Sequence, residues 1–100
     1  MTAEQQPRRE SGAVLDIGGD IGALLFYVGP ERDGEEIDLV PDDPSAPTTH
    51  TKVHPREVEG GTVYAGLFPS VHVGDYRLQL IDGGVPVSVR GGEVTTLPAN

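Results

Sequence analysis

The stretch VLDIGGDIG, residues 14–22, decides between two kinds of fold. An apolar run ends in an acid, passes through glycines and resumes as a second apolar run. Two apolar runs, 13–17 and 21–28, joined by Gly-Gly-Asp are typical of a β-hairpin, because glycine supplies the positive φ angles that tight turns need. We therefore predict a strand, a turn and a strand in this region.

The same stretch resembles the first motif of Rossmann-type methyltransferases, in which a strand ends in an acid before a glycine loop. The residues that match that motif are Val14, Leu15, Asp16, Gly18 and Gly22. The resemblance implies an S-adenosylmethionine-binding fragment, with Asp38 near the position of a second acid. A Rossmann unit needs a helix directly after the loop and further parallel strands, whereas Gly29-Pro30 ends the run 21–28 early. We keep this as a remote alternative and predict no cofactor.

The rest of the chain predicts an all-β protein. Fourteen glycines and nine prolines divide its 100 residues into short pieces with turns about every ten residues. The predicted strands cover residues 13–17, 21–28, 35–40, 48–54, 62–68, 75–80, 85–89 and 93–97. We expect a single small antiparallel β-sandwich of seven or eight short strands. It spans residues 12–98 and follows a flexible, disordered polar tail at residues 1–11.

The charge and the composition of the chain limit the classes of partner that it could bind. The formal net charge is −9, so phosphate backbones and anionic lipid surfaces are repelled, and we expect neither nucleic acid nor a membrane as partner. There is no cysteine for disulfides or thiolate metal sites. The polar N-terminus lacks the apolar segment of a signal peptide, which favours a soluble, cytoplasmic protein.

One basic stripe interrupts this acidic chain. It consists of His50, Lys52, His54 and Arg56. In an extended strand, residues at every second position share one face, and this face is our candidate binding site for an anion or an acidic partner. A hairpin that pairs Val40 with Thr48 instead places Asp38 opposite His50 and Glu36 opposite Lys52, as ordinary cross-strand charge pairs. The sequence leaves both interpretations open.

We predict no metal site and assign no catalytic residue. The histidines His50, His54 and His72 are the candidate ligands. Along a strand His50 and His54 lie about 13 Å apart, too far to share one ion, so only the fold could bring ligands together. The acids between residues 31 and 43 lack the spacing of a calcium loop and are typical of a solvated rim.

The C-terminal half resembles prealbumin-like and Cna-B-like sandwich modules, which share an Ig-like architecture. The matching residues are Gly74, Tyr76 and Leu78 in one strand, and Gly92 with Leu97 in the closing strand. The chain as a whole is similar to short uncharacterised actinobacterial proteins, which imply no activity. Prealbumin-like modules are spacer or interaction domains. The branch that hydrolyses 5-hydroxyisourate ends in Tyr-Arg-Gly-Ser, whereas this chain ends in residues 96–100, TLPAN.

These patterns favour a non-catalytic binding or interaction module, not an enzyme, whose partner is another protein. A second copy of the chain is a further candidate partner, because sheet edges can pair with each other. The alternative is a small metal- or anion-binding accessory protein or enzyme that uses His50, His54 and His72.

Overall fold

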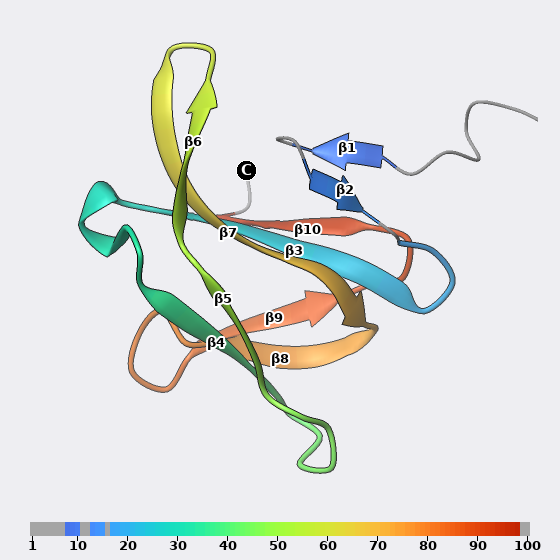
Figure 1. The fold of residues 1–100 in the computed structure, drawn as a ribbon. Helices are drawn as coiled ribbons and strands as arrows, with labels where there is room; N and C mark the ends of the chain where they lie inside the picture. Colours follow the sequence, from blue (N-terminus) through green and yellow to red (C-terminus); the bar gives the residue numbers. More distant parts are fainter. Residues whose placement is uncertain (1–7, 11–12, 16, 99–100) are drawn as a thin grey trace, which may run out of the picture.

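The computed structural model describes residues 8–10, 13–15 and 17–98. Eight strands of this part form two four-stranded sheets that face each other, which confirms the predicted all-β sandwich (Figure 1). In the same residues no helix has the length and apolar character needed to cross a membrane. Of the predicted tail, Arg8–Glu10 is a short strand, and residues 1–7 and 11 lie outside the described residues.

The strands follow one another in short segments, with a 3-10 turn, η2 (Pro30–Arg32), after the third. They are β1 (Arg8–Glu10), β2 (Ala13–Leu15), β3 (Ile21–Val28), β4 (Glu36–Pro41), β5 (Thr49–Lys52), β6 (His54–Val58), β7 (Gly61–His72), β8 (Gly74–Leu78), β9 (Val85–Val89) and β10 (Val94–Leu97). The first sheet, here the β3 sheet, has the order β10-β3-β7-β6. The second, the β4 sheet, has the order β5-β4-β8-β9. Strands β1 and β2 pair only with each other in this described part.

The core between the sheets is apolar, and no polar or charged side chain among residues 17–98 is buried. Alternate residues of β3, β4 and β9 point into it, as the period of two requires. Phe26 of β3 and Phe68 of β7 pack with their ring centroids 6.2 Å apart. The other buried members are Leu24, Ile37, Leu39, Val53, Val71, Leu78, Val87 and Val89.

The opening stretch forms the predicted turn. Gly18 and Ile21 exchange two backbone hydrogen bonds of 2.9 Å, and Gly19 has a φ of 57°. The run that follows is the eight-residue strand β3, so the helix that the methyltransferase motif requires is missing. The strand pairing differs from the predicted hairpin, because β2 pairs with β1. Both edges of β3 are already occupied by β7 and β10, which leaves no edge for residues 13–15.

The hairpin between β4 and β5 has the predicted register. Asp38 lies opposite His50, and Glu36 lies opposite Lys52. The predicted strand 48–54, however, is divided at Val53, which is fully buried. Beyond Val53 the chain leaves the β4 sheet and continues in the β3 sheet as β6, a strand that the pattern did not predict. Its Pro55 is tolerated because β6 lies at a sheet edge.

Two features of the β3 sheet depart from a simple antiparallel arrangement. Strand β10 pairs with β3 in parallel, because the chain crosses back from the β4 sheet after β9 and lies along the edge of β3 opposite β7. Strand β7 runs through Pro69, where the register with β3 shifts between Gly22 and Leu24. A bulge of this kind accommodates proline, which cannot donate a ladder hydrogen bond.

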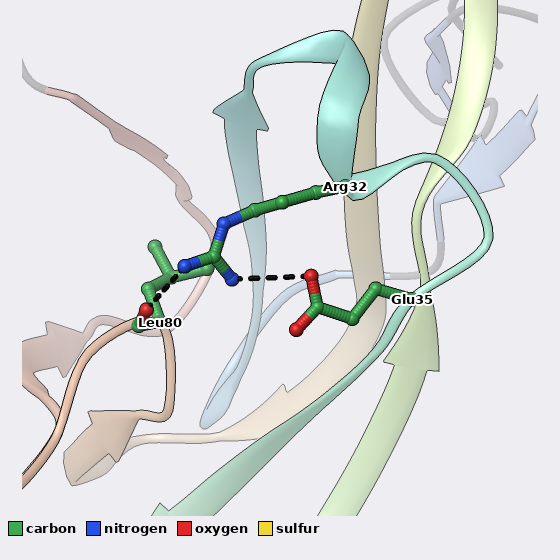
Figure 2. Close-up of polar contacts among 3 residues, drawn as sticks. All are labelled: Arg32, Glu35 and Leu80. Atoms are coloured by element: carbon green, nitrogen blue, oxygen red, sulfur yellow. Dashed lines mark hydrogen bonds and ion pairs between the residues drawn. The ribbon is translucent and has the colours of Figure 1, made fainter.

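Arg32 connects two loops at one end of the sandwich. Its Nη2 donates a 2.6 Å hydrogen bond to the carbonyl oxygen of Leu80, and its Nη1 lies 3.3 Å from Oε1 of Glu35 (Figure 2). The Arg32 side chain is 29% exposed and the Glu35 side chain 47%. The bond to Leu80 is therefore the more protected of the two, and it fixes the 30–35 turn against the segment that follows β8.

We expect Arg32→Met, which keeps the apolar stem, to lower the free energy of unfolding by about 1.5 kcal/mol, because it removes a charged hydrogen bond. Glu35→Gln removes only an exposed ion pair and should cost less than about 0.5 kcal/mol. Urea unfolding of the two variants measures both values. Equal losses would contradict the ranking of the two contacts.

Gly66 of β7 lies under the ring of Phe26. The two residues are cross-strand partners, and a Cβ atom at Gly66 would overlap the Phe26 side chain. Because Phe26 is fully buried, its ring has no solvent-filled space into which to move. The absence of a side chain at residue 66 therefore leaves room for the ring of Phe26, the largest fully buried side chain of the core, against the neighbouring strand.

Gly66→Ala should lower the free energy of unfolding by about 1–3 kcal/mol through overpacking. Gly29→Ala is the matched control, because Gly29 has a φ of −80° and a Cβ there meets only the mobile end of the Glu31 side chain. The control should change stability by less than about 0.5 kcal/mol. Chemical denaturation compares the two, and similar losses would show that Phe26 does not depend on this glycine.

Candidate functional site

A cleft opens at one end of the sandwich, between the loop after β4 and the corner that joins β7 to β8. It consists of two adjoining hollows of about 350 Å³ and 210 Å³. Both hollows are lined by Ala46, His72 and Tyr76, so they form one continuous depression. Few sites on a small sandwich are concave, which makes this cleft the candidate binding site.

The loop wall of the cleft is shaped by a local turn at Asp43. The Oδ1 atom of Asp43 accepts hydrogen bonds from the backbone N–H of Ser45, at 3.0 Å, and from its Oγ, at 2.8 Å. These two bonds lower the pKa of the Asp43 carboxyl, because they stabilise its ionised form. The backbone N–H of Asp42 donates to the carbonyl oxygen of Asp75 at 2.9 Å. These bonds hold the loop against β8 and fix the positions of Asp42 and Asp43.

The opposite wall is held by Tyr76. Its hydroxyl donates a 2.7 Å hydrogen bond to the backbone oxygen of His72, four residues earlier. Burial raises the pKa of the Tyr76 hydroxyl. The backbone N–H of Val73 donates to the carbonyl oxygen of Asp20, in the turn of the opening stretch, at 2.9 Å. The corner is therefore fixed both from within and by the Gly-Gly-Asp turn.

The lining of the cleft is acidic. Asp42, Asp43 and Asp75 all line the larger hollow, and neither hollow has a lysine or arginine in its described lining. Asp75 also accepts a 2.7 Å hydrogen bond from the hydroxyl of Ser88 in β9. Three carboxylates beside the apolar side chains of Pro41 and Val73 suit a cationic group carried on an apolar stem, since the charge and the stem each find a complementary surface.

The predicted basic stripe is divided between the two sheets. His50 and Lys52 project from β5 in the β4 sheet, whereas His54 and Arg56 belong to β6 in the β3 sheet. Across the described ranges, neither Asp38 with His50 nor Glu36 with Lys52 forms an ion pair. That these side chains bind a partner stays a prediction, although they do not form one continuous surface within a single sheet.

The histidines do not converge. His72 lines the cleft, and neither His50 nor His54 does. Within the described part of the chain, no group of three or more His, Cys, Asp or Glu side chains is arranged to hold a metal ion. The acidic cleft itself was not predicted from the sequence, although the pair of acids in the proline-stiffened loop 41–47 was a local signal for it. Asp75 arrives from a distant segment, so no local pattern could associate it with that pair.

Comparisons with models of known families, with curated proteins and with solved structures found no match. The proposed function therefore rests on the geometry of the cleft and on the charge of its lining.

We expect Tyr76→Phe to lower the free energy of unfolding at neutral pH by about 0.5–1.5 kcal/mol, because it removes the bond to His72. Because the pKa of the Tyr76 hydroxyl is raised, the stability that this hydroxyl contributes depends on pH. The stability that Tyr76 contributes through its protonated hydroxyl is complete below pH 10, the ordinary tyrosine value, and is lost as the pH rises through the folded-state pKa. The difference between wild type and variant should therefore narrow above pH 10.

Urea unfolding between pH 7 and pH 11 measures this difference. Tyr27→Phe removes a hydroxyl from a side chain that is 39% exposed and should change the neutral-pH stability little. A difference between wild type and Tyr76→Phe that stays constant over the whole range would contradict the role of the hydroxyl that donates to His72.

Proposed function

We propose that this protein is a non-catalytic binding module that takes a cationic side chain of a partner protein into the cleft at the end of the sandwich. The observation that carries the proposal is the lining of the larger hollow, with three carboxylates and no described lysine or arginine. A formal net charge of −9 adds a long-range attraction for basic partners. The resemblance to prealbumin-like interaction modules supports the same class of function, and a cytoplasmic location remains part of the proposal.

We propose that binding has two stages: long-range electrostatic attraction of the partner, and then contact between its cationic side chain and the cleft. The field of the acidic chain attracts a basic segment, and the cleft then selects a lysine or arginine whose stem can lie on Pro41 and Val73. The wall acids are already positioned by bonds from Ser45 and Ser88, so little ordering is needed when the partner arrives. No bond in the partner is made or broken in this function.

Titration of the ¹⁵N-labelled protein with a tri-lysine peptide tests this proposal. Amide shifts should concentrate at residues 42–46 and 72–76, should saturate, and should weaken as salt screens the attraction. The double variant Asp42→Asn/Asp43→Asn should weaken the affinity several-fold, because it removes two lining charges. The amide oxygen that replaces the Asp43 carboxylate can still accept the bonds from Ser45, so the shape of the loop is kept.

Glu36→Gln/Glu59→Gln is the matched control, since it removes the same charge from two exposed residues outside the lining. It should leave the affinity within a factor of about two. A tri-glutamate peptide should produce no saturating shifts at the cleft. If both double variants weaken tri-lysine binding equally, the attraction belongs to the net charge of the chain and the cleft is not the site.

A further inference from the structure

The outer face of the β3 sheet is apolar. On β3, Leu24 and Phe26 point into the core, so the residues between them, Ala23 and Leu25, project from the opposite side of the sheet. Their cross-strand neighbours on β7 continue this face, since Leu25 pairs with Leu67 and Tyr27 pairs with Ala65. The outer face of the β4 sheet is different, because β4 and β5 present exposed charged or titratable residues there: Glu36, Asp38, His50 and Lys52.

Three side chains of this outer face are nevertheless buried, whereas Tyr27 is 39% exposed. Ala23 is 0% exposed, Ala65 is 1% exposed and Leu25 is 5% exposed, although none of them belongs to the core cluster between the sheets. A leucine on an uncovered sheet face keeps part of its surface in contact with water. The β4 sheet packs on the other side and cannot shield Leu25. Another part of the chain must therefore cover this face.

The N-terminal strands are placed to provide the cover. Strand β2 contacts β7 but is hydrogen-bonded into neither four-stranded sheet. Figure 1 shows β1 and β2 outside the two layers, on the side of β3 and β10 that faces away from β8 and β9. Each of the two strands has three residues, and a two-stranded unit of that size is not stable alone in water. Its position therefore depends on the surface beneath it.

We propose that the outer face of the β3 sheet is a docking surface, and that its occupant in this protein is the chain's own segment of β1 and β2, here the N-terminal strap. The sequence of the strap suits the role, since β2 is Ala-Val-Leu while β1 is Arg-Arg-Glu. An apolar strand over an apolar face would remove both surfaces from water, and the burial of apolar surface would stabilise the contact. This inference is independent of the cleft and of the function proposed for it.

Spin labelling of the full chain tests the position of the strap. The protein has no cysteine, so Arg9→Cys in β1 gives a single site for a nitroxide. The label should broaden the amide signals of Leu25, Ala65 and Leu67 much more than those of Arg77 and Val87 in the β4 sheet. A control label at Asp82→Cys, in the loop after β8, should reverse this order. Equal, weak broadening of both sheets by the label at residue 9 would overturn the proposal.

A pair of full-length variants tests the apolar contact. Val14→Asp/Leu15→Asp should raise the fluorescence of the dye ANS several-fold and lower the melting temperature, because it frees the outer face. Arg8→Gln/Arg9→Gln makes the same change in net charge within the strap and should do neither. The freed face also admits a second copy of the chain, so a dimer formed only by the first variant would support a docking surface. Identical dye binding and melting in both variants would overturn it.

Discussion

The ring of Phe26 occupies the space that a side chain at Gly66 would need, and the pairing of β3 with β7 around this contact organises the rest of the sandwich. The two strands form the centre of one sheet, and their inward residues supply both aromatic rings of the core. Once β7 occupies one edge of β3, the other edge is open to a single further strand, which is β10. The order of the sheet, the exclusion of β2 and the closing position of the C-terminal strand all follow from that occupancy.

The same arrangement positions the cleft. Strand β7 continues past the Pro69 bulge to the corner at His72, and the carbonyl oxygen of Asp20 fixes the backbone of Val73 there. The turn of the opening stretch thus has a structural role at the site, since it holds the corner against which the acidic loop closes. On the other wall of the cleft, β4 ends at Pro41, so that the next residue, Asp42, lies beside Asp75. The cleft is a product of where two strands end and not of any one motif.

The two outer faces of the sandwich differ in chemistry. The β4 sheet presents charged side chains, whereas the β3 sheet presents alanine and leucine side chains that are largely withdrawn from water. A two-layer fold buries one face of each sheet, so a second apolar face needs another cover. A large apolar face is unusual on a 100-residue chain with a formal net charge of −9, so its burial needs a physical explanation. The N-terminal strap and the acidic cleft occupy different surfaces, and each can be tested without the other.

Local chemistry determined much of this protein from its sequence alone. Glycine pairs marked the turns, alternation marked most of the strands, and the loop 41–47 set the register that places Asp38 opposite His50. Only the tertiary structure decided that β10 joins β3 in parallel, that the chain changes sheets at Val53, and that the basic stripe is therefore divided. It also brought Asp75 to Asp42 from a distant part of the chain. Turn geometry and side-chain alternation depend on neighbours along the chain, whereas the choice of a strand's partner depends on which edges and faces remain free after the others have packed.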